Sequence, residues 1–288
     1  MKSDPTISIF GTGALGSALL NYFQHSGYHV QSAWTSKDGS VFSKVSGSLE
    51  SVGYEFPTKV NEVGDWIFIT TPDDIIAEIS EKLLNLKSDW NGHSVIHCSG
   101  GLTSKKLEGL NNAGASTASM HPIQTFRRGD TRSRFQDIYI SIEGSEDIKT
   151  DLENLIIDME AYPLSLSTEQ KKIVHIAAVF ASNYLVALLG MADEYLKAEG
   201  IEDGLEILRP LIHQTILNIE QKGIHEALSG PVARGDGKTI SSHLSALEGK
   251  NELAFYKLLG NQAIKIAEEG HQIDETKSER LRKLFSQH

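Results

Sequence analysis

Cysteine is almost absent from this chain: Cys98 is the only one in 288 residues. A single cysteine excludes an internal disulfide and leaves no cysteine pair for zinc, and it fits a reducing cytoplasm. The sequence also contains no Gly-x-Ser-x-Gly nucleophile elbow. Because Cys98 lies in an apolar run, we expect a buried, inert thiol. No metal site is predicted.

Basic residues are scarce relative to acidic ones. The chain has 27 Lys and Arg against 38 Asp and Glu, which gives a formal net charge of −11. This balance argues against a nucleic-acid partner and favours a soluble protein with small ligands. The first apolar run begins at Thr6, which leaves no room for a signal peptide, so we expect a cytoplasmic location.

One long apolar stretch, residues 173–192, approaches the thickness of a bilayer. It contains polar residues at 175, 182 and 183 and is flanked by charged pairs at 171–172 and 193–194. We therefore expect a helix buried within an all-helical domain, and no membrane span.

The strongest motif lies near the N-terminus. The β-prone run 6–10 is followed by Gly11-Thr12-Gly13-Ala14-Leu15-Gly16 and then by a helical segment at 18–23. In this order Gly11 permits the tight turn, Gly13 lets the backbone approach a pyrophosphate, and Gly16 lets helix and strand pack closely. The helix N-terminus offers N–H groups to phosphates. The motif predicts a dinucleotide site, with a purely structural turn as the alternative.

Strand and helix patterns alternate through the first half of the chain. This alternation predicts an α/β fold with a Rossmann-type, doubly wound, mostly parallel sheet whose ligand crevice lies at the carboxyl ends of the strands. The expected strands are 6–10, 28–33, 65–70, 93–98, 116–120 and 138–142, and the expected helices are 18–23, 75–86 and 103–110.

Only helical patterns follow after about residue 165, and we therefore expect two domains. Residues 1–165 would form the dinucleotide-binding domain and residues 166–288 an all-α domain. The expected helices of the second domain are 168–198, 203–222, 238–248, 250–270 and a charged helix from 275.

The end of the second predicted strand bears on cofactor choice. NAD-specific sites place an acidic residue roughly 20 residues past the glycines. Thr35, Ser36 and Lys37 stand there instead, and they suit a 2′-phosphate, which favours NADP over NAD. NAD remains an alternative, because a shift of one residue in register would bring the Asp38 carboxylate close to the ribose. The other alternative is that residues 35–37 form a solvated turn without a role in binding. Two further strand ends are expected over the cofactor, unless they are simple turns: Thr71-Pro72 and Ser99.

Several residues are candidates for the chemistry. His121, next to Pro122 and just past a predicted strand, could donate a proton to a carbonyl, because the pKa of histidine lies near neutrality. Its alternative role is a backbone hydrogen bond. On the long helix, His175 and Ser182 are seven residues apart and would share a face, with Asn183 rotated from them. These side chains line a substrate cleft or bond across helices.

Two arginine-containing segments remain. Arg234, in a loop between helices, could clamp a substrate carboxylate or phosphate, or pair with Asp236. The basic cluster at Arg127, Arg128, Arg132 and Arg134 is interpreted as a solvated loop in preference to an anion funnel.

Four motifs together resemble a known family. They are His97-Cys-Ser-Gly100, Ser119-Met-His-Pro-Ile-Gln-Thr-Phe126, Ala178-Val-Phe-Ala-Ser-Asn-Tyr184 and Ala227-Leu-Ser-Gly-Pro-Val-Ala-Arg-Gly-Asp236. They are similar to Rossmann-like proteins, classified as NADP oxidoreductases without an assigned reaction, that have a C-terminal helical domain of unknown function. Wider relatives are pyrroline-5-carboxylate reductase, the 6-phosphogluconate and β-hydroxyacid dehydrogenases, and the deazaflavin-dependent NADP reductases.

The resemblance implies a homodimer joined through the helical domains, with substrate between the two domains. β-Hydroxyacid enzymes use a lysine four residues before an asparagine on the long helix. Here Val179 stands four residues before Asn183, so that mechanism does not transfer. We expect an NADP-dependent oxidoreductase of a small carbonyl, imine or hydroxy compound, using His121, His175, Ser182 and Asn183. The alternatives are a non-catalytic nucleotide sensor or structural homodimer, and a reductase with a deazaflavin as hydride partner.

Overall fold

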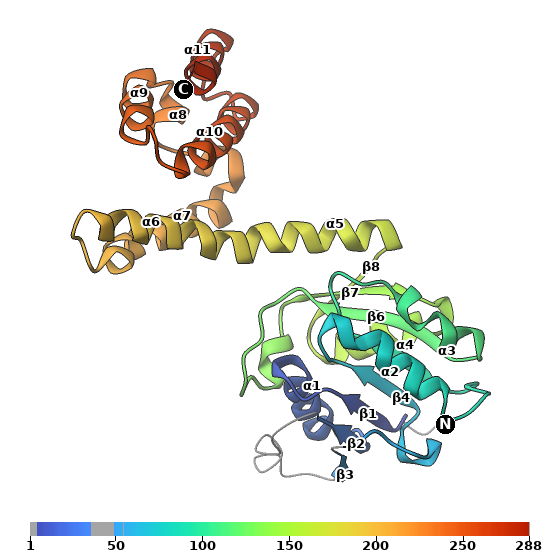
Figure 1. Cartoon of the computed structure of the whole chain (residues 1–288). Helices are drawn as coiled ribbons and strands as arrows, with labels where there is room; N and C mark the ends of the chain where they lie inside the picture. The colour runs from blue at the N-terminus through green and yellow to red at the C-terminus, as the bar shows by residue number, and fades with distance from the viewer. Residues whose placement is uncertain (1–4, 36–48, 54, 288) are drawn as a thin grey trace. The chain divides into compact units, whose positions relative to one another are not determined.

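The computed structural model describes residues 5–35, 49–53 and 55–287 (Figure 1). The chain divides into two compact units, Met1–Leu185 and Val186–His288. The strands end at Ser165, close to the expected boundary of 165/166, but the first unit also includes the helix that follows. That helix is attached to the first unit by two hydrogen bonds: Thr168 donates to Glu143 in the sheet, and Lys171 donates to the Ser99 carbonyl just beyond a strand.

The first unit is built on one eight-stranded sheet in the order β3-β2-β1-β4-β5-β6-β7-β8. The first six strands in this order are parallel, β7 is antiparallel to β6, and β8 is parallel to β7. The expected α/β, doubly wound and mostly parallel architecture is confirmed. The strands are β1 Ile7–Phe10, β2 Val30–Trp34, β3 Leu49–Gly53, β4 Trp66–Ile69, β5 Ser94–His97, β6 Ser116–Pro122, β7 Tyr139–Gly144 and β8 Tyr162–Ser165.

Apolar residues fill both faces of this sheet, as a doubly wound fold requires. Neighbouring residues of β4 illustrate this, because Phe68 packs into one core cluster while Ile67 and Ile69 pack into the other. Helices α1 and α4 contribute to the first cluster and α2 and α3 to the second. Their bounds are α1 Ala14–His25, α2 Asp73–Leu84, α3 Glu108–Asn112 and α4 Glu146–Asp158.

Within its described residues the second unit contains helices joined by turns and loops, and no strand, as expected. Its small core contains Ile240, Leu244, Ile264, Leu281 and Phe285, all almost fully buried. Its helices are α6 Leu185–Ala198, which begins at the last residue of the first unit, α7 Gly204–Ala227, α8 Pro231–Arg234, α9 Gly237–Ala246, α10 Glu252–Glu269 and α11 Glu275–Gln287.

The long apolar helix differs from its prediction. It consists of α5 Thr168–Val179, a π-helical turn η5 Phe180–Tyr184, and α6. Burial was expected, but Ile173 and Phe180 are 65% and 63% exposed. By length and composition alone, Thr168–Ala198 is the one described helix that could cross a membrane.

Several elements escaped the sequence analysis. β3, α4, β8 and the short helix α8 were not predicted. The helix expected over 103–110 begins instead as a 3₁₀ turn at Ser104–Leu107, and Thr103 provides no side-chain cap. β6 continues to Pro122, so His121 lies within a strand and not just past its end.

Candidate functional site

The glycine turn between β1 and α1 has the geometry that the motif predicts. Gly11 has φ +97°, a conformation that favours glycine, and a Cβ there would lie 2.9 Å from the Thr71 nitrogen. A Cβ on Gly16 would lie 2.0 Å from the Gly11 oxygen. Gly13 differs, because a Cβ there meets no atom within 4 Å. Two glycines therefore close the turn, while the third leaves space beside the backbone.

That space belongs to a pocket of about 540 Å³ at the carboxyl ends of β1, β2 and β4. Six residues predicted to bind the cofactor line it: Gly11, Thr12, Gly13, Thr35, Thr71 and Pro72. Ala14, Leu15 and Gly16 form the first turn of α1 beside it. Of the three residues predicted to contact a 2′-phosphate, Thr35 lines the pocket. The other two, Ser36 and Lys37, lie outside the described residues.

The polar atoms of this pocket fit a dinucleotide. Thr12 is only 5% exposed, yet its hydroxyl has no hydrogen-bond partner among the described residues, and the same holds for the buried hydroxyl of Thr71. A buried hydroxyl without a partner is costly, so a ligand oxygen there would be favourable. The first turn of α1 contains no acidic residue, and its N-terminus is therefore open to a phosphate.

A second polar cluster forms around Gly100, just after β5. The rings of His121 and His175 lie 5.9 Å apart at an interplanar angle of 79°. A Cβ on Gly100 would lie 2.5 Å from His175 Nδ1 and 2.7 Å from His121 Nε2. The structure thus brings together two histidines that are 54 positions apart in the sequence, and any side chain at Gly100 would move at least one of their rings.

Lys171 belongs to this cluster and was missed by the sequence analysis. Its side chain is 2% exposed, and Nζ donates to the Ser99 carbonyl at 2.8 Å. Burial lowers the pKa of Lys171 to about 8, and the Glu143 carboxylate opposes that shift. Glu143 itself accepts hydrogen bonds from Ser104 and Thr168. In the sequence Lys171 is part of a charged flank of the apolar helix, whereas in the structure the helix phase turns its side chain toward the Ser99 carbonyl.

Burial also decides what His121 can do. It lowers the pKa of His121 to about 4, so the ring is neutral at pH 7. The expectation of a pKa near neutrality was therefore wrong. The Nδ1–H group donates to the Cys98 carbonyl at 3.1 Å, which leaves Nε2 as a hydrogen-bond acceptor. His121 is thus arranged to accept a hydrogen bond at Nε2 in the resting protein, and not to donate a proton there.

The neighbours of this cluster have structural contacts of their own. The Ser99 hydroxyl accepts a hydrogen bond from the Leu102 nitrogen at 2.9 Å, so it closes a turn. Burial raises the pKa of Cys98 to about 12, which agrees with the inert thiol expected from the sequence.

Ser182 and Asn183 lie in the π-helical turn η5. A π turn inserts an extra residue, so the shared face predicted for His175 and Ser182 from regular α-helical geometry does not apply. Ser182 is half-buried and Asn183 is exposed, and neither side chain makes a hydrogen bond within the described residues, although the Ser182 carbonyl accepts from the Leu185 nitrogen. Within the described residues, no hydrogen bond or ring contact joins Ser182 or Asn183 to His121 or His175.

Arg234 lies in the second unit, at the end of α8. The Asp236 carboxylate caps α9 by accepting from the Thr239 nitrogen and hydroxyl at 3.1 and 2.7 Å. The hydrogen bonds from Thr239 and, to a smaller extent, the charge of Arg234 lower the pKa of Asp236, but no ion pair between Asp236 and Arg234 forms within 4 Å. The Arg234 side chain is exposed.

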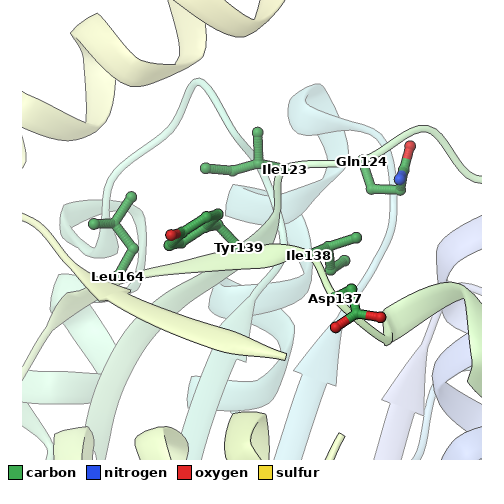
Figure 2. A pocket seen from close by; sticks show the side chains of 6 residues that line it. All are labelled: Ile123, Gln124, Asp137, Ile138, Tyr139 and Leu164. Atoms are coloured by element: carbon green, nitrogen blue, oxygen red, sulfur yellow. The ribbon is translucent and has the colours of Figure 1, made fainter. Parts of the chain in front are cut away.

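Figure 2 shows a further pocket on the sheet, beside β7 and β8. Its lining is mostly apolar and comprises Ile123, Gln124, Asp137, Ile138, Tyr139 and Leu164. His121 pairs with Ser141, and Ser141 pairs with Leu164, so these three side chains point to one face. The sheet face at His121 therefore passes from a polar cluster to an apolar surface.

Burial of histidine makes a prediction for stability. Burial lowers the pKa of both His97 and His121 from 6.5 to about 4. Between these values the unfolded chain binds more protons than the folded one, so the free energy of unfolding should fall as the pH drops from 6.5 to 4. At about 1.4 kcal/mol per unit, each histidine contributes at most about 3 kcal/mol.

Urea denaturation at a series of pH values would measure this dependence. His121→Gln should flatten the slope between pH 6.5 and 4, because it removes one of the two groups. An identical slope in the variant and the wild type would show that His121 is protonated equally in both states.

Comparison with known proteins agrees with this architecture. Two solved structures match this chain at 22% identity over nearly the whole of both chains. One is a candidate NADP oxidoreductase from Bacteroides fragilis, with a TM-score of 0.71 and a match that covers 91% of this chain and 98% of that chain. The other is a protein from Thermotoga maritima, with a TM-score of 0.72 and a match that covers 92% of this chain and 99% of that chain. A reductive aminase from Aspergillus terreus, solved with NADPH and ethyl levulinate, has TM-score 0.61 at 14% identity over 99% and 93%. These likenesses define a Rossmann-type sheet followed by a helical domain.

The family comparison is narrower. Residues 138–263 match the model described as Domain of unknown function (DUF2520), which confirms the resemblance seen in the motifs. No curated protein matches the sequence significantly.

Proposed function

We propose that this protein is an NADP-dependent oxidoreductase acting on a small carbonyl, imine or hydroxy compound. The observation that supports it best is the pocket at the glycine turn, where backbone space beside Gly13 meets the unpartnered hydroxyls of Thr12 and Thr71. The Bacteroides protein is described as an NADP oxidoreductase and the Aspergillus enzyme was solved with NADPH, which supports the same cofactor here. When bound, the nicotinamide supplies or accepts a hydride.

The two histidines would handle the proton that accompanies this hydride. His121 Nε2 is an acceptor, and His175 Nδ1 is buried without a partner among the described residues. Both nitrogens therefore have capacity for a substrate hydroxyl or amine. Lys171 would act as a positioning residue, because its hydrogen bond to the Ser99 carbonyl fixes the turn that precedes Gly100. Asn183 and Ser182 remain predictions as substrate-orienting groups, and Arg234 as a substrate clamp.

Thermal unfolding with NADPH, with NADH and without ligand tests the cofactor. A ligand that binds only the folded state stabilises it by about 2.7 kcal/mol at 100 times its dissociation constant. We expect NADPH to raise the melting temperature more than NADH at the same concentration and salt. Stabilisation by neither would contradict the proposed site and favour a structural role for the glycine turn.

The histidine roles have a separate test. His121→Ala combined with His175→Ala should abolish oxidation of an identified hydroxy or amine substrate, in which these nitrogens accept from the substrate, while leaving stabilisation by NADPH unchanged. Unchanged turnover in the double variant would refute the assignment. NADPH binding without turnover of any tested substrate by the wild type would favour the non-catalytic nucleotide sensor.

We further propose a homodimer, supported by the exposed apolar side chains of Ile173, Ile176, Phe180 and Tyr184 on α5 and η5. Contiguous exposed apolar surface of this kind typically marks an interface. Sedimentation velocity should give twice the mass of the 31.6 kDa chain. Phe180→Glu should shift the protein toward monomer, whereas Ile157→Glu, at a position 58% exposed on α4, should not. A wild-type monomer, or recovery only in detergent, would contradict this proposal.

A further inference from the structure

Arg128 lines the pocket of the glycine turn, although it comes from a distant loop between β6 and β7. The sequence favours a solvated loop over an anion funnel for its basic cluster. Of the four arginines in that cluster, Arg128 alone is among the residues that line this pocket. It therefore shares one cavity with the backbone of Gly11–Gly13 and with the unpartnered hydroxyl of Thr12.

A tight turn presents this side chain. The Asp130 nitrogen donates to the Arg127 carbonyl at 3.1 Å, and the Arg127 nitrogen donates to the Asp130 carboxylate at 2.7 Å. Gly129 takes φ +95°, which the third position of such a turn favours in a glycine. Arg128 stands at the corner between these two hydrogen bonds, so the position of its backbone is fixed.

Further contacts attach this loop to α1, the helix that begins at the pocket. Arg134 donates to the Thr125 carbonyl at 3.0 Å and lies 3.8 Å from the Asp130 carboxylate. The Arg132 nitrogen donates to the side-chain oxygen of Asn21 on α1 at 3.2 Å. Phe135 is fully buried, with its ring 6.1 Å from that of Tyr22. The side chains of Arg134 and Phe135 and the backbone of Arg132 thus fix the loop and attach it to α1, whereas the side chain of Arg128 lines the pocket.

The charges around the pocket leave this guanidinium available. Lys82 and Arg128 are its two lining cations, and Lys82 already pairs with Glu78 at 2.7 Å. Arg128 makes no ion pair or hydrogen bond within residues 5–35, 49–53 and 55–287. Glu55 is the remaining lining carboxylate. A free guanidinium in a preformed loop is suited to a phosphate, which it can bind through two parallel hydrogen bonds.

We infer that Arg128 binds a phosphate group of the bound dinucleotide, and that this group is the pyrophosphate. The pyrophosphate is favoured because the backbone that meets pyrophosphate in such turns, Gly11–Gly13, lines the same pocket. This inference rests on the proposed function. It gives the loop between β6 and β7 a role in cofactor binding, and for Arg128 it favours the anion-binding alternative over the solvated loop.

Titration of the full-length protein with NADPH and with NADH tests the inference. Arg128→Gln should weaken binding of both at least tenfold at fixed salt, because both contain the pyrophosphate. Arg127→Gln is the matched control, since Arg127 is the adjacent exposed arginine and contributes its backbone, not its side chain, to the turn. The control should bind as the wild type does, and both variants should keep the ligand-free melting temperature. Arg128→Lys should recover part of the affinity.

The outcomes separate this inference from the proposed function. A loss confined to NADPH would overturn the assignment to the pyrophosphate, because it would place Arg128 at the 2′-phosphate instead. Wild-type affinity in Arg128→Gln would overturn the inference and leave the proposed function intact. Equal losses in Arg128→Gln and Arg127→Gln would overturn it as well, because only a general effect of positive charge would remain. Failure of the wild type to bind either dinucleotide would refute both.

Discussion

Gly13→Ala is expected to weaken NADPH binding at least tenfold while leaving the fold intact. Gly13 is the N-cap of α1, with φ −66° and ψ −161°, a conformation open to alanine. A Cβ there meets nothing within 4 Å, so the ligand-free protein has room for it. A bound pyrophosphate, however, must approach the backbone at this position. The free energy of unfolding should change by about 1 kcal/mol or less.

Gly16→Ala is the matched variant, and its main effect should be a loss of stability in the ligand-free protein. Its Cβ would lie 2.0 Å from the Gly11 oxygen and 2.5 Å from the Thr70 hydroxyl. The first of these is backbone, so β1 and α1 must separate, and we expect a loss of about 3 kcal/mol or more. Urea denaturation without ligand and fluorescence titration with NADPH measure the two effects separately. Wild-type affinity in Gly13→Ala would mean that no phosphate lies against this turn.

The glycine turn was predictable because its signal is local. Strand, turn and helix follow one another within residues 7–25, so the motif is recognised without any distant contact, although Gly11 and Gly16 also pack against Thr70 and Thr71. β8 gave no such signal, since four residues including Pro163 form an edge strand that depends on β7 for its pairing. Helix α4 could have been predicted from the sequence, because Ile148, Leu152 and Leu155 follow helical spacing.

The histidine cluster was only partly predictable. His121 and His175 could each be proposed from a strand end and an apolar helix, but their contact depends on how the start of α5 lies on the sheet. Lys171 was missed because it adjoins Lys172 and the two look alike in sequence. The structure buries the first and exposes the second. The available signal was spacing, since Lys171 lies four residues before His175 and therefore on the same helix face.

Gly100→Ala should test this cluster directly, with turnover falling about 100-fold. The added Cβ would lie 2.5 Å from His175 Nδ1 and 2.7 Å from His121 Nε2, so at least one ring must move. A displacement of about 1 Å at a reacting group costs on the order of 100-fold in rate. Because both atoms lie at the ends of side chains, the rings can turn aside, and the fold should lose only about 1 kcal/mol.

Gly101→Ala is the control for that experiment. Its Cβ would lie 3.6 Å from His175 Cδ2, an ordinary contact, so turnover should stay near that of the wild type. The NMR shifts of the His121 and His175 rings give a second measurement that needs no substrate, and they should move in Gly100→Ala and hardly change in Gly101→Ala. NADPH affinity should be similar in both variants, because neither glycine lines the pocket of the glycine turn. Equal turnover in the two variants, despite displaced ring signals, would mean that the histidine pair organises the fold and takes no part in the reaction.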